Sequence, residues 1–224
     1  MRTILLGMTM ALAVAAAARA GEPELKTDEE KTIYALGLAM SQSLAPFNLS
    51  EKEFAVFQAG LTDGVLKKEQ KVDFKAFTPK IGELARARAK VVADNNKKAA
   101  QPFLDKAAGE KGAKKTASGL VFMELKAGSG DTPQASDTVK VQYEGKLSDG
   151  TVFDSSIKRG EPATFPLNGV IKCWTEGLQM MKVGGKAKLV CPSDIAYGDQ
   201  GRPPQIGPGA PLVFEVELLE IVKK

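Results

Sequence analysis

The stretch TVKVQYEGKLSDGTVFDSS, residues 138–156, decides the fold class. Its first part, Thr138–Leu147, is a β-rich run of the kind that favours a strand. Ser148, Asp149 and Gly150 follow, and this combination signals the tight turn between two antiparallel strands. The stretch therefore predicts a β-hairpin and, with it, an antiparallel sheet.

Runs of the same kind lie on both sides of this hairpin, separated by Gly, Pro, Asp and Asn. They span residues 120–125, 187–190 and 212–222. Within residues 169–181 the sequence predicts one short helix, around 174–181. A sheet that carries one helix is an α+β module. We therefore predict an antiparallel β-sheet wrapped around one short helix for residues 118–224.

Before the sheet, the sequence predicts two short helices with similar starts. Thr27 with Glu30, and Ser50 with Glu53, match the capping-box pattern. Apolar residues then recur at helical spacing: Ile33, Leu36, Met40 and Leu44 in the first helix, and Phe54, Phe57, Leu61 and Val65 in the second. We expect the first helix to end near Pro46 and the second near Lys68.

A third helix is predicted to be long and mostly polar. Thr78 and Pro79 are typical of an N-cap and a first helical position, and Pro102 is expected to kink or end the helix. The glycines and lysines that follow predict a solvated linker and a domain boundary at residues 109–118. Because this helix exposes little apolar surface of its own, it is interpreted as a connector between two bodies.

The apolar stripes of the two N-terminal helices need a partner surface, because two short helices cannot bury them alone. Small helical units commonly pair with a second copy, so we predict a homodimer. Packing of the stripes on the C-terminal half of the same chain is the alternative. The predicted organisation is an all-helical dimerisation domain at residues 21–72, a long connecting helix with a linker at 73–117, and the sheet domain at 118–224.

The first 20 residues predict a secretory signal peptide. Arg2 supplies the positive start, residues 4–18 are almost wholly apolar, and Ala18, Arg19 and Ala20 form a small-residue cleavage site. A membrane anchor, the alternative, needs about 20 unbroken apolar residues, and this run is shorter. We therefore expect cleavage after Ala20, no membrane span in the mature chain and a periplasmic location.

The charge balance argues against a nucleic-acid partner. Removal of Arg2 and Arg19 takes the basic residues from 31 to 29, against 27 acidic ones, so the mature chain carries a net charge of about +2. Histidine is absent, which excludes Ser-His-Asp and Cys-His catalysis and removes the commonest metal ligand. We predict neither a metal site nor a cofactor.

Five segments in the C-terminal half occur in the order known from one enzyme family. They read VQYEG at 141–145, GTVFDSS at 150–156, GVIKCWTEG at 169–177, IAYG at 195–198 and LVFEVEL at 212–218. In this order they resemble the successive signatures of FKBP-type peptidyl-prolyl cis-trans isomerases. Together with the signal peptide, the N-terminal helices and the connector, they resemble the periplasmic, dimeric group of FkpA and the macrophage infectivity potentiator.

The resemblance implies an enzyme that rotates X-Pro bonds in folding envelope proteins, with proline-containing polypeptides as substrates. It implies an aromatic pocket with these members: Trp174 as floor; Tyr143, Phe153, Val170, Ile171 and Phe214 as walls; Tyr197 as hydroxyl donor; Ile206 as a further contact; and Asp154 as the one charged group inside. The backbone N–H of Ile171 would anchor the peptide. A non-catalytic holdase chaperone that uses this fold as a docking surface is the alternative.

Each of these residues also has a simpler interpretation. The aromatic residues could be core residues of a small sheet, and Asp154, which precedes two serines, could be a turn former. Three positions depart from the family's best-known human members: Ala163, Arg202 and Gln205 stand where phenylalanine, histidine and isoleucine are common. Binding of tacrolimus-like macrolides and the preferred residue before proline therefore stay open.

Cys173 and Cys191 are the only cysteines in the chain. The resemblance places Cys173 at the start of the short helix and Cys191 at the end of the strand beneath it. In an oxidising compartment this arrangement implies a disulfide, with two free core thiols as the alternative.

Overall fold

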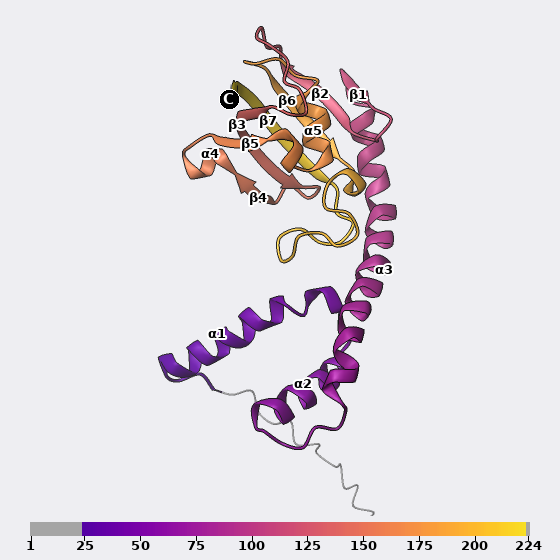
Figure 1. Cartoon of the computed structure of the whole chain (residues 1–224), viewed down its shortest axis with the longest axis vertical. Coiled ribbons are helices and arrows are strands. Elements are labelled where there is room, and N and C mark those ends of the chain that lie inside the picture. Colours follow the sequence, from indigo (N-terminus) through magenta and orange to yellow (C-terminus); the bar gives the residue numbers. More distant parts are fainter. Residues whose placement is uncertain (1–23, 223–224) are drawn as a thin grey trace, which may run out of the picture. The chain divides into compact units, whose positions relative to one another are not determined.

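The computed structural model of this chain describes residues 24–222, so the predicted signal peptide lies outside the described residues (Figure 1). These residues belong to two compact units, of which the first ends at Ala39 and the second begins at Met40. None of the helices within residues 24–222 combines the length and the apolar character that a membrane span requires.

The first helix, α1 (Asp28–Gln42), begins with the capping box that the sequence predicts. The Thr27 N–H donates to Glu30 Oε2 at 2.8 Å, and the Glu30 N–H donates to Thr27 Oγ1 at 3.1 Å. These two bonds satisfy amide groups that have no partner inside the helix. The helix ends somewhat before Pro46, which lies in the short 3₁₀ turn η1 (Ala45–Phe47).

The second helix, α2 (Glu51–Val65), also begins with its predicted capping box, because the Ser50 N–H donates to Glu53 Oε2 at 2.9 Å. Arg88 from the third helix pairs with the same Glu53 carboxylate and donates to the Phe47 carbonyl at 2.8 Å. One arginine therefore holds η1 and the start of α2 against the third helix.

The third helix, α3 (Phe74–Ala108), begins earlier and ends later than the sequence predicts. Asp73 is the N-cap and accepts from the Lys75 N–H at 2.9 Å, whereas Thr78 lies inside the helix and its hydroxyl donates to the Phe74 carbonyl at 2.7 Å. The prediction of Thr78 as N-cap is therefore wrong, because Asp73 offers an equally good cap one turn earlier.

Pro102 does not end α3, so of its two predicted effects, a kink or an end of the helix, the end is excluded. An interior proline costs about 3 kcal/mol, so the last turns need compensation from elsewhere. Ala107 is buried with Val121, Met123 and Val190 of the sheet, and Phe103 packs against the same cluster. We attribute the continuation of the helix to this apolar contact.

The expected linker is not wholly solvated, because part of it forms the edge strand β1 (Ala113–Lys115). This strand pairs antiparallel with β2 (Val121–Lys126), with Ala113 opposite Met123 and Lys115 opposite Val121. The sheet therefore begins within the predicted boundary region, about five residues before residue 118, because the lysines of this region also suit a charged edge strand.

The antiparallel sheet has the strand order β1-β2-β6-β7-β3-β4, and β5 also pairs with β3. Its remaining strands are β3 (Thr138–Leu147), β4 (Val152–Ser155), β5 (Ala163–Pro166), β6 (Lys186–Cys191) and β7 (Leu212–Val222). The bounds of β3 and β7 match those predicted. The β3–β4 turn is the predicted hairpin, in which Gly150 has a φ of +90° and the Leu147 N–H donates to the Thr151 carbonyl at 2.9 Å.

Helix α5 (Lys172–Leu178) packs against β6 and supplies Trp174 and Leu178 to the core (Figure 1). The helix begins at residue 172, where 174 was predicted, and ends at residue 178, where 181 was predicted. A Cβ atom on Gly177 would lie 2.8 Å from Leu189 Cδ1, so glycine allows the helix to approach the sheet closely. The α+β fold is confirmed, with two strands and one α-helix that the sequence analysis missed: β1, β5 and the one-turn helix α4 (Ser156–Arg159).

Candidate functional site

Trp174 forms the base of an aromatic cluster inside the sheet domain. Only 4% of the residue is exposed. The rings of Tyr143, Phe165 and Phe214 lie 5.0, 5.6 and 5.4 Å from it between centroids, each nearly perpendicular to the indole. Edge-to-face contacts at these distances are favourable, so the cluster holds the tryptophan in one orientation.

The sheet brings these rings together from strands that are distant in sequence. Tyr143 lies on β3, Phe214 on its neighbour β7 and Phe153 on β4. The rings of Phe153 and Phe214 meet edge to face, 5.7 Å apart. A Cβ atom on Gly145 would lie 2.7 Å from Phe153 and 2.9 Å from Phe214, so glycine is required where these two rings cross the strand.

These rings surround a cavity of about 590 Å³. Of the predicted site residues, eight line it: Tyr143, Phe153, Asp154, Val170, Ile171, Trp174, Tyr197 and Phe214. Ile206, the ninth, lines an adjoining cavity of about 240 Å³ together with Gln205. The two cavities share Phe153, Asp154 and Arg202, so they meet at the charged side of the site.

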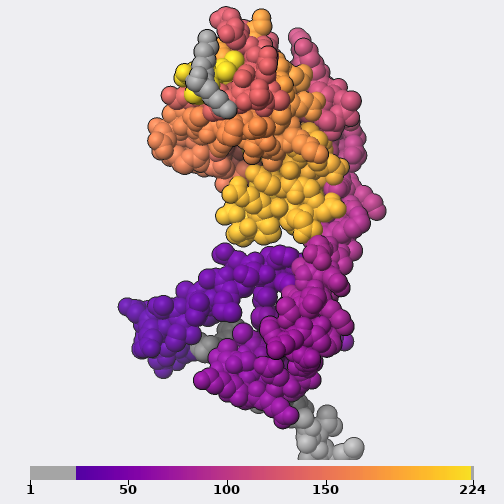
Figure 2. Space-filling view, viewed as in Figure 1, coloured from indigo at the N-terminus to yellow at the C-terminus, as the bar shows by residue number. Residues whose placement is uncertain are grey.

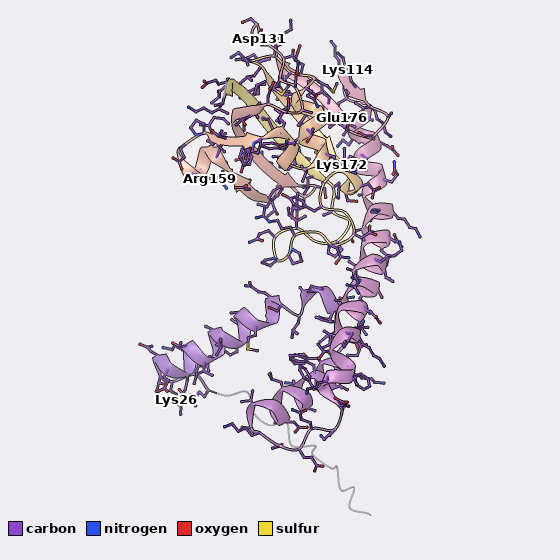
Figure 3. All side chains as sticks on the ribbon, viewed as in Figure 1. Lys26, Lys114, Asp131, Arg159, Lys172 and Glu176 are labelled. Atoms are coloured by element: carbon purple, nitrogen blue, oxygen red, sulfur yellow. A yellow bond between two sulfur atoms is a disulfide. The ribbon has the colours of Figure 1, made fainter. Side chains whose placement is uncertain are left out.

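One wall of the cavity is a hydrogen-bonded group of three polar side chains. The Tyr143 hydroxyl donates to Asp154 Oδ2 at 2.5 Å, and Arg159 pairs with Asp154 Oδ1 and donates to the Tyr143 hydroxyl at 2.9 Å. Arg159 lies at the end of α4 (Figure 3). Ser156 orients this segment, because its hydroxyl accepts from the Tyr143 N–H at 2.8 Å.

This group keeps Asp154 charged and Tyr143 neutral. Burial alone would raise the pKa of Asp154, but the hydrogen bonds from Tyr143 and Arg159 outweigh it, so the pKa lies below its ordinary value. Burial first, and then the bond to Asp154, raises the pKa of the Tyr143 hydroxyl. At neutral pH the cavity therefore contains a carboxylate beside a protonated phenol.

Several donors at the cavity have no protein partner within the described residues, and the buried Trp174 Nε1–H is one of them. The Tyr197 hydroxyl makes no hydrogen bond there, and the Ile171 N–H is free because Ile171 precedes α5 as its N-cap. The first amides of a helix commonly lack internal partners, and a ligand carbonyl can satisfy them. Within residues 24–222, no cluster of histidine, cysteine, aspartate or glutamate is arranged to hold a metal ion.

Comparison with known proteins matches both halves of the chain. The model of the FKBP-type peptidyl-prolyl cis-trans isomerase matches residues 130–219, and that of the domain amino terminal to such isomerases matches residues 29–123. FkpA of Aeromonas hydrophila is 44% identical over 92% of this chain and 81% of its own length. The chain belongs to the FKBP-type peptidyl-prolyl cis-trans isomerases.

Further similarities of this isomerase extend over most of its length. The peptidyl-prolyl cis-trans isomerase Mip of Coxiella burnetii is 36% identical over 100% of this chain and 99% of its own. The crystal structure of FkpA from Escherichia coli has a TM-score of 0.62 and 38% identity, covering 88% of this chain and 98% of that chain. The family resemblance inferred from the five segments is thus confirmed, and with it the isomerase activity.

The cavity is also lined by Arg159 and Phe165, which the sequence analysis missed. Arg159 follows Asp154 by five residues, and only the turn of α4 brings its guanidinium back to the carboxylate. On the short strand β5, the half-buried Ala163 and Phe165 alternate with exposed residues, and this alternation was the signal that could have revealed both the strand and the ring.

The three departures from the family pattern lie at different places. Arg202 lines both cavities and has no ion pair within the described residues, and Gln205 lines the smaller cavity. Ala163 packs against the core cluster but lines neither cavity. The rim of this isomerase therefore carries an exposed guanidinium beside the charged wall of the site.

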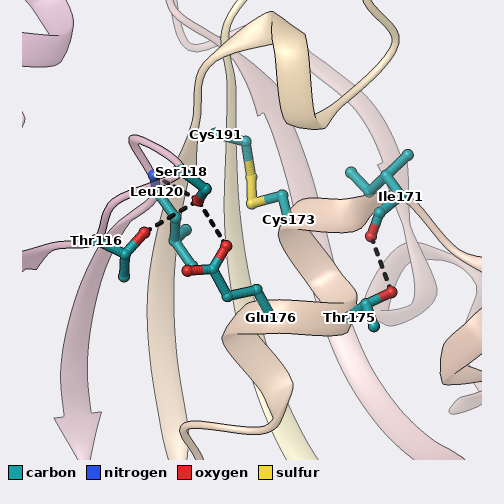
Figure 4. The surroundings of a disulfide bond; sticks show 8 residues. All are labelled: Thr116, Ser118, Leu120, Ile171, Cys173, Thr175, Glu176 and Cys191. Carbon is teal, nitrogen blue, oxygen red and sulfur yellow. Dashed lines mark hydrogen bonds between the residues drawn. A yellow bond between two sulfur atoms is a disulfide. The ribbon is translucent and has the colours of Figure 1, made fainter. Parts of the chain in front are cut away.

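A disulfide joins α5 to the end of β6 (Figure 4). It joins Cys173, the residue before Trp174, to Cys191 at the end of β6, with 5.9 Å between the Cα atoms. This is the pairing that the resemblance implied. Beside it, the Ser118 hydroxyl donates to Glu176 Oε2 at 2.6 Å and ties the chain before β2 to α5.

Proposed function

We propose that this isomerase acts on proline-containing polypeptides that fold in the periplasm, and that its active site is the aromatic cavity above Trp174. The observation that carries the proposal is the composition of the cavity. Aromatic rings form its floor and walls, and one ionised carboxylate, Asp154, lies on its side. Such a cavity can bind a proline ring and lower the barrier to rotation without a covalent step.

The energetics of the reaction suit such a site. The barrier to rotation about an X-Pro amide is about 18–20 kcal/mol, because rotation breaks the amide resonance. The planar amide is more polar than the twisted one, so a dry aromatic cavity disfavours the ground state relative to the transition state. An acceleration of about five decades requires about 7 kcal/mol. Desolvation and a few directed hydrogen bonds can supply this sum.

Each cavity residue has a proposed role. The proline ring packs on Trp174 between Tyr143, Phe153 and Phe214, the rings that already contact one another. Val170 and Ile206 complete the apolar surface around the ring. The Tyr197 hydroxyl donates to the carbonyl of the twisting amide, the Ile171 N–H anchors the peptide, and the Asp154 carboxylate polarises the amide.

Two substitutions test these roles in a protease-coupled or NMR exchange assay on a proline peptide. We expect Asp154→Ala and Tyr197→Phe each to lower kcat/KM by about tenfold, which corresponds to about 1.4 kcal/mol of lost transition-state stabilisation. Asp131→Ala is the matched control, because Asp131 is an exposed acidic residue outside both cavities. Unchanged turnover in both cavity variants would remove this site from the mechanism.

We also infer that the chain acts as a homodimer through residues 21–72, with 73–117 as connector and 118–224 as the catalytic domain. Support comes from exposed apolar side chains: Ile33 is 61% and Leu36 is 60% exposed. Sedimentation velocity should give a dimer for the full chain and a monomer for Ile33→Lys with Leu36→Lys. Gln42→Lys on the same helix is the control, and a persistent dimer in the double variant argues against this interface.

The periplasmic location is inferred from the N-terminal pattern, and its residues lie outside those described. Cell fractionation should find the protein in the periplasm, with Gly21 as the first residue of the mature chain by mass spectrometry. A cytoplasmic protein that keeps Met1 would contradict the inference.

A holdase activity is the second candidate, because the exposed apolar side chains of α1 and α2 offer a surface for unfolded clients. Aggregation suppression by Asp154→Ala at the wild-type level would separate this activity from catalysis. The sequence leaves the binding of a tacrolimus-like macrolide open, and competition with the proline peptide tests it.

A further inference from the structure

Lys97 of α3 contacts the loop that carries Tyr197, although α3 lies outside the aromatic cavity. Its ammonium group donates to Asp194 Oδ1 at 2.6 Å and to Asp199 Oδ1 at 2.7 Å. These two aspartates stand on either side of Tyr197 in the sequence. Both hydrogen bonds raise the pKa of Lys97 above its ordinary value, so the side chain stays charged.

The far end of the same loop, residues 193–211, also contacts α3. Asn96 Nδ2 donates to the Pro208 carbonyl at 2.8 Å. Gly209, with a φ of +70°, lies so close to the fully buried Ala93 that a Cβ atom on it would be 2.5 Å from the Ala93 carbonyl oxygen. Figure 2 shows this loop, coloured yellow, against the magenta surface of α3. Ala93, Asn96 and Lys97 together form what we call the α3 clasp.

Hydrogen bonds inside the loop connect the clasp to Tyr197. The Gly198 N–H donates to the Ser193 carbonyl at 2.8 Å, and the Gly209 N–H donates to the Gly198 carbonyl at 3.0 Å. The Gly201 N–H donates to the carbonyl of Tyr197 itself at 3.1 Å. The backbone on each side of Tyr197 is therefore tied to the segment that the clasp holds.

We propose that Lys97 is a positioning residue of the isomerase, which holds the loop so that the Tyr197 hydroxyl faces the substrate carbonyl. The connecting helix is then part of the catalytic apparatus and not only a spacer. The proposal rests on the role proposed above for Tyr197. It concerns a residue that touches neither the cavity nor the substrate.

A purely stabilising role for Lys97 predicts a different result. The side chains of Lys97, Asp194 and Asp199 are 31%, 69% and 35% exposed, and ion pairs that are open to water contribute little to stability. A small displacement of a catalytic donor, by contrast, lowers turnover strongly. Loss of Lys97 should therefore change kcat much more than it changes the melting temperature.

The test measures kcat and KM on a proline peptide for full-length Lys97→Met, Lys97→Arg and Lys98→Met, each with and without Tyr197→Phe. Lys98 is the matched control, because it is exposed and makes no ion pair within the described residues. We expect Lys97→Met to lower kcat by about three- to tenfold with little change in KM. Lys97→Arg should restore most of the activity, and Lys98→Met should match the wild type.

The double variants show whether Lys97 affects turnover through Tyr197. If Lys97 acts through Tyr197, Lys97→Met has no further effect on kcat once Tyr197 is phenylalanine. Two outcomes overturn the proposal and leave the catalytic role of Tyr197 standing. One is a wild-type kcat in Lys97→Met. The other is a double variant whose loss of kcat equals the product of the two single losses. Unchanged turnover in Tyr197→Phe alone contradicts the role of Tyr197 itself, and with it the path from Lys97.

Discussion

Asp154 keeps its charge inside a mostly aromatic cavity because two neighbours hydrogen-bond to it. Tyr143 donates to one carboxylate oxygen, and Arg159 pairs with the other. The same arginine also lies 5.5 Å from the centroid of the Tyr143 ring, so one side chain orders both members of the charged wall. Arg159 thus supports the site although the sequence motifs do not mark it.

The pH dependence of turnover should reveal this support. In the wild type, the pKa of Asp154 is lowered, so kcat/KM should begin to fall only when the pH drops below the ordinary range of an aspartate pKa. Arg159→Met removes a stabilising partner while burial remains, so the pKa of Asp154 rises and the acidic limb of kcat/KM moves to higher pH. Lys158→Met, an exposed neighbour on α4, should leave the profile unchanged. Superimposable profiles for all three proteins would contradict the role of Arg159.

At the residue scale, the sequence predicts the parts of the site that lie within contiguous motifs. Trp174, Tyr143 and Asp154 each stand inside a segment whose order along the chain is informative. Arg159 and Phe165 were missed because their roles depend on how α4 and β5 fold back toward β3, and neither element has a pattern long enough to predict.

Helix ends show how local signals combine with tertiary contacts at the scale of elements. Glu53 accepts from the Ser50 amide and pairs with Arg88 of α3. The hydrogen bond from Arg88, followed by those from Ser50, lowers the pKa of Glu53 from 4.5 to about 2. One carboxylate therefore caps α2 and joins it to α3.

Glu53→Gln should lower the melting temperature of the helical region at pH 7. A lowered carboxylate pKa contributes stability above the unfolded value of 4.5, and this contribution disappears as the pH falls toward about 2. The difference in melting temperature between Glu53→Gln and the wild type should therefore shrink as the pH falls from 4.5 to about 2. Circular dichroism melts at pH 7, 4.5 and 2 measure it, with Glu51→Gln as control. A difference that stays constant with pH would contradict the linkage.

The disulfide joins α5, which carries Trp174, to the end of β6, which precedes the loop that carries Tyr197. The two cysteines are 18 positions apart in the sequence, so loss of the bond should destabilise the domain by about 3 kcal/mol. Denaturant unfolding of Cys173→Ala with Cys191→Ala, compared with the unreduced wild type, measures this loss. Two free thiols in denatured, unreduced wild-type protein would show that the bond does not form in solution.

Local rules predicted both N-terminal capping boxes and the strands β3 and β7, because all residues that define a cap or a β-rich run are neighbours in the sequence. They predicted neither the continuation of α3 past Pro102 nor the strand β1. The continuation of α3 depends on Val121, Met123 and Val190 of the sheet, and β1 exists only because β2 offers it a partner. Contacts between elements that are distant in sequence do not appear in a local pattern.

For the whole molecule, these contacts revise where the catalytic body begins. All five sequence motifs lie within residues 118–224. However, β1 and the last turns of α3, which lie before residue 118, cover Val121, Met123 and Val190. The α3 clasp adds a further dependence on residues before 118. We therefore expect a chain that starts at residue 73 to behave as a complete catalytic body, and one that starts at 118 to lack part of its sheet edge and its core.

Melting temperature and turnover of the two truncated chains test this boundary. Exposure of the three apolar side chains costs about 1.5–3 kcal/mol for each one that is fully uncovered. For a domain of this size, each kcal/mol corresponds to about 4–8 °C. The chain from 118 should therefore melt at least about 10 °C below the chain from 73. It should also turn over a proline peptide more slowly, because Lys97 is missing. A chain from 118 that matches the longer one in both measurements would show that the motifs alone delimit the enzyme and that α3 contributes only spacing.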